Sequence, residues 1–422
     1  MSTRVGLPTG RHAHLYALLV LALTFSANAY AQTSEAPPSE QSNQDYLTGS
    51  WGGLRPNLMS QGVAFDAAYT VDAFANVRGG AQKHGAYLHN VDITLGVDAN
   101  ELMGWQGASF FGYMLGNYGD ALSDYVGDLQ GVSNIEAPGA WQLYEAWFQQ
   151  NLFNDAVSVR MGLYDLNSEF ASIETAGLYL GSSHGIGPDF SQSGLNGPSI
   201  FPATGFATRL LIQPTASLYA QTVLIEAVPG NGLPGTPRVQ FTPGEGWLWA
   251  SEAGIVPANA PGRKLGAGYW RYTKPFETLD GAGSAVGYGI YAIGEQALYD
   301  ASREGARGAS LYGRVGWASP EVHPIAFAWA AGVAVNGPFR SRPDDQFGLA
   351  VATAHQGSQM MEAMRLAGDT PESDEITFEI TYSTSILPWI AIQPNIQYVH
   401  NPGGVATLND AFVVGTRLGI AF

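Results

Sequence analysis

Seven charged side chains of this chain fall where they can share one face of an extended backbone. In a strand, residues two apart point to the same side, so charges interleaved with apolar residues face away from the apolar surface. Arginine offers a fixed fork of donors and glutamate two acceptor oxygens, and opposed rows of both would orient water and polar solutes. The candidate donors are Arg160, Arg209, Arg314 and Arg417, and the candidate acceptors are Glu145, Glu252 and Glu379.

Three further residues belong to this candidate site. Trp147 and Trp270 are possible inward-facing stacking platforms, and packing is the alternative for both. Glu169 lies at the root of a long loop, where it is predicted either to line a constriction or only to anchor the loop. The alternative for the charged side chains is mutual pairing on a wet wall. Charge on a lipid-facing surface, by contrast, costs roughly 2 to 4 kcal/mol for an arginine at the membrane midplane.

Motifs for catalysis and metal binding are weak. Residues 181–185 read GSSHG and match the GxSxG pattern, but that pattern needs a strand-turn-helix setting and lies here in a long loop rich in glycine and serine. No HExxH occurs, and the pair Asp344-Asp345 after Pro343 is typical of a turn. The absence of cysteine excludes disulfides and thiolate metal sites. We therefore expect no enzyme activity, no metal and no cofactor.

The elements that must position the charged residues are two-faced strands. One face of residues 411–422 is apolar and almost continuous, whereas the other carries small or charged side chains, among them Arg417. The same alternation recurs in 63–77, 87–97, 157–163 and 376–386, and more weakly in 209–213. This inversion is typical of strands with lipid outside and water inside. A water-soluble sandwich would give the same local pattern.

The number of such segments favours a barrel. About 16 of them are present, an even number that suits a closed outer-membrane barrel. They begin near residues 63, 87, 106, 141, 156, 204, 216, 246, 263, 284, 307, 323, 344, 374, 389 and 410. The sequence thus predicts an all-β fold, a transmembrane antiparallel β-barrel of about 16 strands over residues 63–422, with a short N-terminal helical segment before it.

Composition and the amino terminus indicate where the barrel resides. The chain has 19 Lys and Arg against 36 Asp and Glu, which argues against nucleic acid as a partner. Residues 1–31 are predicted to be a cleaved secretory signal, because Arg4 and Arg11 precede the apolar run 15–25 and small residues follow. A retained anchor is the alternative. Residues 32–62 are predicted to form a periplasmic tail and a short helix. An exported, cysteine-free, acidic chain with β-strand alternation is predicted to reside in the outer membrane of a Gram-negative cell.

The longest connection is the segment 166–203, with Gly, Ser, Asn and Pro throughout. A loop of this length is usually functional or disordered, and a water-filled barrel has room for it. We predict that it folds inward and narrows the pore. The connections 119–139, 229–246 and 356–374 are predicted to be long outer loops, and 151–155, 213–217 and 387–389 to be periplasmic turns.

Four stretches together resemble the carbohydrate-selective porins of the OprB family. They are LTGSWGGLR at 47–55, RMGLYDLNSEF at 160–170, GPFRSRPDDQFGLAVA at 337–352 and QPNIQYVHNPGG at 393–404, spread over almost the whole mature chain. Ser50 departs from the acidic residue expected in the first stretch. The resemblance implies a 16-stranded outer-membrane barrel that admits glucose and related sugars by passive diffusion.

A sugar filter should offer a ring of donors and acceptors and an aromatic face for the C–H side of the sugar. The alternative functions are a general or other small-solute porin without sugar preference, an outer-membrane barrel hydrolase, and a structural or adhesive barrel without conductance. A phosphate channel would need inward rows of Lys or Arg, whereas this chain carries many inward acids. The expected partners are carbohydrate solutes and outer-membrane lipid, and the protein is expected to be a monomer or homo-oligomer.

Overall fold

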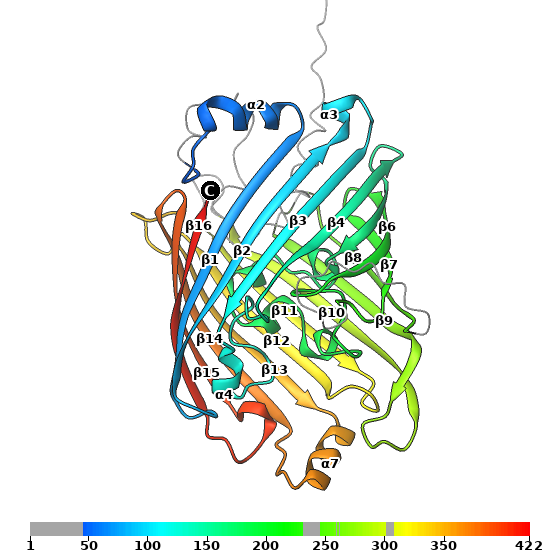
Figure 1. Cartoon of the computed structure of the whole chain (residues 1–422), viewed down its shortest axis with the longest axis vertical. Helices are drawn as coiled ribbons and strands as arrows, with labels where there is room; N and C mark the ends of the chain where they lie inside the picture. Colours follow the sequence, from blue (N-terminus) through cyan, green and yellow to red (C-terminus); the bar gives the residue numbers. More distant parts are fainter. Residues whose placement is uncertain (1–44, 231–244, 259, 261, 301–307) are drawn as a thin grey trace, which may run out of the picture.

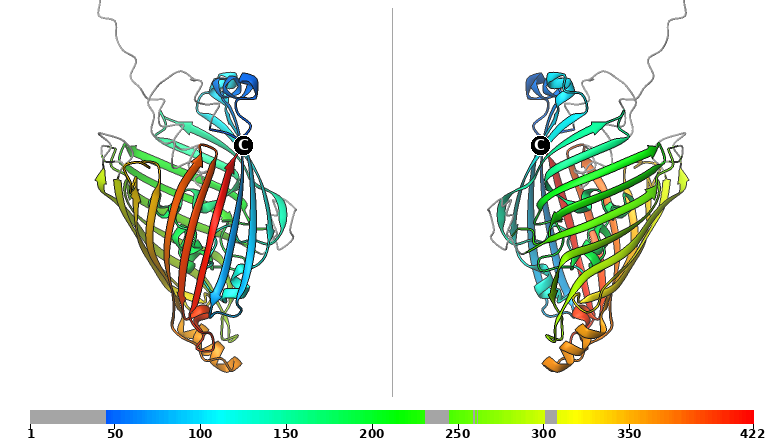
Figure 2. Two further views of the ribbon diagram at one scale, coloured as in Figure 1. Left: turned by 90° about the vertical axis from the view of Figure 1, so that its left-hand side faces the viewer. Right: turned by 90° about the vertical axis from the view of Figure 1, so that its right-hand side faces the viewer.

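The backbone of this protein closes into a barrel of antiparallel strands. The computed structural model describes residues 45–230, 245–258, 260, 262–300 and 308–422, so the predicted signal 1–31 and residues 32–44 of the predicted tail lie outside the described residues. Each strand pairs with its neighbours in sequence, and β16 pairs with β1 to close the barrel (Figures 1 and 2). Among the described residues the strands are β1 (Val63–Arg78), β2 (His84–Asp98), β3 (Ala108–Gly119), β4 (Ala140–Leu152), β5 (Val157–Tyr164), β6 (Gly205–Thr215), β7 (Leu218–Glu226), β8 (Trp247–Ile255), β9 (Arg263–Glu277), β10 (Ser284–Asp300), β11 (Gly308–Ala318), β12 (Ile325–Asn336), β13 (Gln346–Gln356), β14 (Asp374–Leu387), β15 (Ile390–His400) and β16 (Ala411–Ala421).

The predicted fold class is confirmed, down to the starts of the strands. Every predicted start lies within three residues of the observed one, and the largest difference is at β2, which begins at His84 rather than near 87. The agreement has a physical cause. Each strand carries its own alternation of apolar and small or polar residues, and glycine or polar residues interrupt that alternation at the connections.

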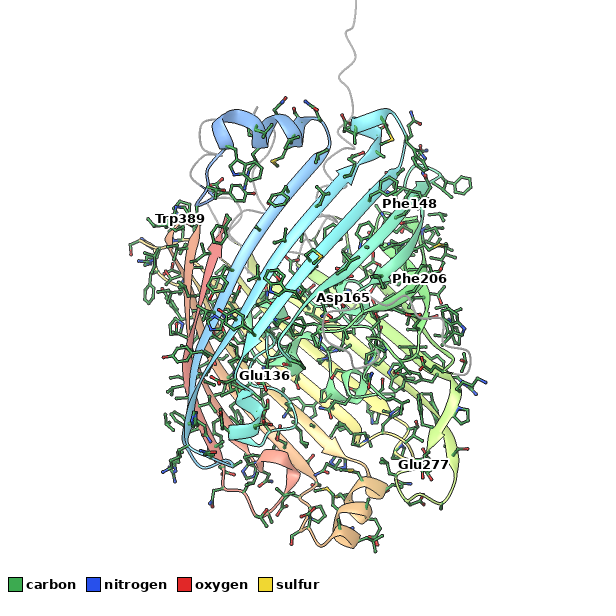
Figure 3. All side chains as sticks on the ribbon, in the orientation of Figure 1. Glu136, Phe148, Asp165, Phe206, Glu277 and Trp389 are labelled. Atoms are coloured by element: carbon green, nitrogen blue, oxygen red, sulfur yellow. The ribbon has the colours of Figure 1, made fainter. Side chains whose placement is uncertain are left out.

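The faces of the strands also follow the alternation. On β14 the side chains of Phe378 and Ile380 are exposed on the outer surface, whereas Glu379 between them is buried in the lumen. Aromatic residues such as Trp249 and Trp317 are likewise exposed on the outside. Figure 3 shows Phe148 and Trp389 near the rim that carries the carboxyl terminus. The outer surface is therefore apolar and the lumen polar, as a strand between lipid and water requires.

The two ends of the barrel differ. The tight turns 216–217 and 388–389 and the carboxyl terminus share one end, the upper end in Figure 1, where α2 (Leu54–Ser60) and α3 (Ala99–Met103) also lie. There Arg55 of α2 donates to the backbone oxygen of Phe422 at 2.7 Å. The long connections lie at the other end, together with α4 (Leu122–Val126) and α7 (Ser358–Ala367). Among the described residues, the helices are all too short or too polar to span a membrane.

The long connection 166–203 lies inside the barrel. It contains η4 (Leu166–Ser168), η5 (Thr175–Leu178), α5 (Ser182–Gly185) and α6 (Pro188–Ser191). Its apolar residues pack against inward side chains of β6 to β13, and Phe170 and Phe190 are almost fully buried there. Tyr179 donates to the backbone oxygens of Val333 on β12 and Leu349 on β13. We call residues 165–175 the loop root and residues 178–193 the loop tip.

The connection 119–139 was predicted to be a long outer loop, but residues 129–134 fold into the lumen instead. Leu129 and Gln130 donate their backbone N–H groups to the carboxylate of Glu375 on the lumen side of β14. Asn134 donates its backbone N–H to Leu180 of the loop tip at 2.8 Å. Two loops therefore fill the middle of the lumen and brace each other. The third long connection, 229–246, falls mostly outside the described residues.

Candidate functional site

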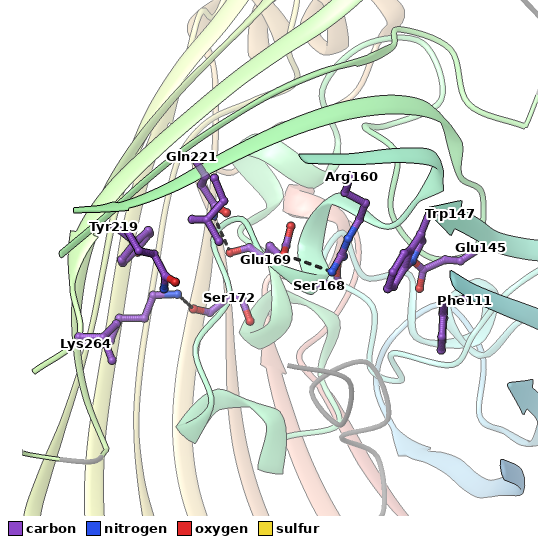
Figure 4. Close-up of a pocket in the computed structure, with 13 residues that line it drawn as sticks. Phe111, Glu145, Trp147, Arg160, Ser168, Glu169, Ser172, Tyr219, Gln221 and Lys264 are labelled. Carbon is purple, nitrogen blue, oxygen red and sulfur yellow. Dashed lines mark hydrogen bonds and ion pairs between the residues drawn. The ribbon is translucent and has the colours of Figure 1, made fainter. Parts of the chain in front are cut away.

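A hollow of about 860 Å³, part of it open to solvent, lies between the loop root and the barrel wall (Figure 4). It opens toward the end of the barrel that carries the carboxyl terminus, since Gln213, Val256 and Lys264 lie at the strand ends on that side. The side chains around it are Phe111, Glu145, Trp147, Arg160, Ser168, Glu169, Ser172, Leu211, Gln213, Tyr219, Gln221, Val256 and Lys264.

The root is fixed by a carboxylate clamped between two arginines. Glu169 follows η4 and receives two bonds of 2.8 Å from the Nε and Nη2 groups of Arg209. Arg160 stands 3.5 Å from the same carboxylate, and Tyr164 donates to it at 2.5 Å. Gln149 accepts from both guanidinium groups and so holds the two like charges side by side.

The electrostatics of Glu169 follow from this arrangement. Burial alone would raise the pKa of its carboxyl group, but the opposing charges of Arg160 and Arg209 outweigh burial and lower the pKa to about 2. Glu169 therefore stays ionised throughout the physiological range. Arg209 is only 1% exposed, so within this cluster a solute can reach little beyond the edges of Arg160 and Glu169.

Trp147 lies beside this cluster, but its flat faces are not free for stacking. The ring of Phe111 stacks at 5.1 Å, and the guanidinium carbon of Arg160 lies 3.9 Å from the ring centroid. Only 8% of the residue is exposed. The interpretation of Trp147 as an open platform is therefore wrong. The ring instead supports Arg160 at the edge of the hollow.

Two glutamates of the wall bind the backbone of the root. Glu252 accepts from the backbone N–H of Ala171 at 2.7 Å and from Tyr219 and Tyr291 at 2.8 Å each. Glu145 accepts from the backbone N–H of Asp165 and from Trp147. Both carboxylates are thus largely occupied by the protein itself.

The structure places Arg314, Glu379 and Trp270 at the loop tip, away from the hollow. Glu379 accepts from the backbone N–H groups of Leu180 and Gly181 and lies 3.3 Å from His184. Arg314 donates to the backbone oxygen of His184.

Trp270, on β9, is completely buried, and Phe190 of α6 stacks on its ring at 4.9 Å. It faces inward as predicted, but the loop covers it. The interpretation of Trp270 as a stacking platform for a solute is therefore wrong, because no solute reaches its ring.

Arg417 belongs to a third place in the lumen. It forms a two-bond pair with Asp72 at 2.7 Å for each bond and donates to Asn134 of the connection 120–139. This pair joins β16 to β1 across the closing seam. The ten candidate residues therefore occupy three places, and only Arg160, Glu169, Glu145 and Trp147 line the hollow.

Several residues of the hollow were not predicted. Tyr219, Gln221 and Lys264 line it from β7 and β9, and Ser168 and Ser172 from the loop root. The alternation of β7 and β9 was available as a signal for the first three.

The GSSHG motif lies in α5 of the loop tip. Gly181, the first residue of the motif, is extended, but the residues before it do not form a strand. Both ring nitrogens of His184 are engaged, one near Glu379 and one with Tyr312. Such a setting lacks the strand-turn-helix geometry of a hydrolase nucleophile.

In the part of the chain that the structure describes, no three His, Cys, Asp or Glu side chains gather as metal ligands.

A closed antiparallel barrel with an apolar exterior, a charged lumen and an inward loop defines the class of outer-membrane porins. Within this class, the family described as "Carbohydrate-selective porin, OprB family" matches residues 82–422, and the chain belongs to it. It is therefore a carbohydrate-selective porin of the outer membrane. Channel rather than enzyme function follows from membership of this family.

Relatives agree with this assignment. Porin B of Pseudomonas aeruginosa is 25% identical, over 95% of both chains. The high-pH structure of Pseudomonas putida OprB is 22% identical and superposes with a TM-score of 0.81 over 91% of this chain and all of that chain. The low-pH structure of the same protein gives a TM-score of 0.61 over 90% of this chain and 99% of that one. These structures support the fold.

Proposed function

We propose that this porin passes glucose and related sugars by passive diffusion and selects them at the hollow beside the loop root. The single observation that carries the proposal is the clamped carboxylate of Glu169. It fixes the inward loop where Arg160, Gln221, Lys264 and the hydroxyls of the root face one solvent-filled space. A sugar carries many hydroxyls and no charge, so it needs donors and acceptors at short range rather than one strong ion pair.

Passive transport requires weak binding. The charged groups around the hollow already bond to one another, so a sugar gains only what their remaining donors and acceptors offer. A weak site speeds entry without trapping the solute. No cofactor is needed for this mechanism.

The experiment is liposome swelling with purified protein, comparing glucose with uncharged amino acids and with disaccharides of graded size. We expect glucose to enter faster than its size predicts. Arg160→Ala and Glu169→Ala should each reduce this advantage, because one removes a donor from the hollow and the other releases the loop root. Arg365→Ala is the matched control, since Arg365 is exposed on α7 outside the lumen.

Entry graded by size alone would contradict the sugar preference and leave a general porin for small solutes. No swelling by protein that is correctly folded would contradict the channel itself. Folding is checked by the mobility of unheated protein in gel electrophoresis, which distinguishes a closed barrel from an unfolded chain.

We also propose that residues 1–31 are removed during export. The support is the charged start, apolar run and small residues of this segment. N-terminal sequencing of protein isolated from the outer membrane should give Gln32 as the first residue. A protein that begins at Met1 there would contradict the proposal.

A further inference from the structure

A sugar filter should contain an aromatic face, and both predicted tryptophans are covered. Phe111 and Arg160 occupy the two sides of Trp147, and Phe190 with the wall encloses Trp270. The hollow has another aromatic residue on its opposite side, Tyr219 of β7, which Figure 4 shows next to Lys264 and across from Trp147.

Tyr219 lies along the barrel wall over two glycines. It pairs in register with Gly254 of β8, and Gly254 pairs with Gly266 of β9, so these three residues form one row across neighbouring strands. A methyl group built on Gly254 or Gly266 would stand 2.6 or 2.8 Å from the tyrosine oxygen. Two consecutive positions without side chains therefore let the phenol group of Tyr219 lie against the wall.

Two contacts fix this ring. Its hydroxyl donates to Glu252 at 2.8 Å, which holds the tip of the side chain. The ammonium group of Lys264 stands 5.6 Å from the ring centroid, near the outer limit of a cation–π contact, and donates to the backbone oxygen of Ser172 at 2.8 Å. The ammonium group thus lies over the ring face, but at a greater distance than the 3.9 Å that separates Arg160 from the ring of Trp147.

Other tyrosines of the wall use glycines in the same way, but the loop covers them. Tyr291 lies over Gly268 in the adjacent row and donates to the same Glu252, yet it is 5% exposed and packs beside Phe190. Tyr312 lies over Gly332 and is 4% exposed. Tyr219 differs because it remains partly exposed and lines the hollow.

The geometry points to Tyr219 as the stacking platform of this porin, with Gly254 and Gly266 as the residues that make room for it. The inference rests on the proposed sugar filter and adds which face of the sugar is recognised. The polarised C–H groups of a pyranose ring favour the electron-rich face of an aromatic ring. An acyclic hexitol carries similar hydroxyls but has no such flat face. Tyr219 is therefore a determinant of preference for cyclic over acyclic polyols.

The test compares glucose and sorbitol entry by liposome swelling in three variants. In the unmodified protein, the ratio of glucose to sorbitol entry should exceed the value expected from size. Tyr219→Leu should lower this ratio by roughly two- to tenfold, the range that an aromatic contact supports. Tyr219→Phe keeps the ring and should retain most of the ratio. Tyr291→Phe removes the other hydroxyl bound to Glu252 and is the matched control, with no expected change.

Each outcome bears on a different statement. An unchanged ratio in folded Tyr219→Leu would overturn Tyr219 as the platform while the sugar filter stands. An equal loss in Tyr219→Phe and Tyr291→Phe would overturn it too, because the effect would come from Glu252. A ratio set by size alone in the unmodified protein would overturn the filter itself and the platform with it.

Gly266→Ala gives a second test that keeps the tyrosine. The new methyl group would meet the oxygen of Tyr219 and side-chain atoms of Ile293, the nearest atoms to that position. The ring must then move off the wall, so the glucose to sorbitol ratio should fall while total entry of small ions changes less. Gly294→Ala on β10 is the control, because the nearest atoms to its methyl group are at 3.6 Å. A ratio unchanged by Gly266→Ala would overturn the role of the glycine row.

Discussion

The root and the tip of one inward loop use the same residue types for different purposes. At the root, Glu169 of the loop is bound by Arg160 and Arg209 of the wall, next to a solvent-filled hollow. At the tip the carboxylate belongs to the wall instead: Glu379, only 1% exposed, binds the backbone of the loop. Inward charge therefore identifies the lumen, and only solvent access separates a filter from an anchor.

Glu169 of the root and Asp189 of the tip differ in their protonation. Arginine charges lower the pKa of Glu169 at the root to about 2 despite its burial. Burial raises the pKa of Asp189 at the tip to about 6, although Arg314 acts in the opposite direction. Glu169 is thus held in an ion pair, whereas burial dominates at Asp189 despite the arginine near it.

The largest expected effect concerns the tip anchor. Glu379→Ala leaves the N–H groups of Leu180 and Gly181 buried without an acceptor, at about 1 to 3 kcal/mol each. We expect the tip to leave the wall and the free energy of unfolding to fall by about 3 to 5 kcal/mol in total. Thermal unfolding and chymotrypsin cleavage after Tyr179 or Phe190 measure this. The control is Glu362→Ala on the exposed surface of α7, and equal stability of the two variants would contradict the anchor.

The next effect concerns the root and should separate it from the tip. Glu169→Gln removes the charge that Arg209 binds through two bonds, so we expect a loss of about 2 to 3 kcal/mol. Unlike the tip variant, this one should change the charge around the hollow and therefore the ion selectivity of the channel. Reversal potentials across a planar bilayer in a salt gradient should shift toward anions. A shift of the same size in Glu379→Ala would remove the distinction between root and tip.

The sequence predicts the barrel better than it predicts this division. Strand starts and faces follow from local alternation, so β14 or β16 can be placed from a dozen residues. Solvent access depends on where the loop lies, and nothing near Trp270 in sequence says that Phe190 will cover it. The role of Tyr219 is equally hidden, because it requires two glycines beneath the side chain. The pairing register of two neighbouring strands, β8 and β9, brings these glycines there.

A smaller effect of pH should act through Asp189 at the tip. Docking of the loop raises the pKa of Asp189 to about 6, so the docked state binds the proton at a higher pH than the undocked state does. Docking is therefore strengthened as the pH falls from above 6 toward the usual carboxyl pKa. Between pH 7 and 5 we expect a gain of roughly 1 kcal/mol. Hydrogen exchange at the amides of the tip, corrected for intrinsic rates, measures it. Asp189→Asn should abolish this part of the dependence, and an identical profile in that variant would exclude Asp189 as its source.

The smallest expected effect tests whether the root needs the shape of Arg160 or only its charge. Arg160→Lys keeps a cation near Glu169 but loses the flat group over Trp147, a contact of about 0.5 to 1 kcal/mol. Stability should change little, yet the ammonium cannot bond to Gln149 and stay over the indole at once. Glucose entry should therefore fall toward the size-limited rate while ion selectivity stays the same. If both stay the same, charge alone suffices at the root, and the root would differ from the tip only in its access to water.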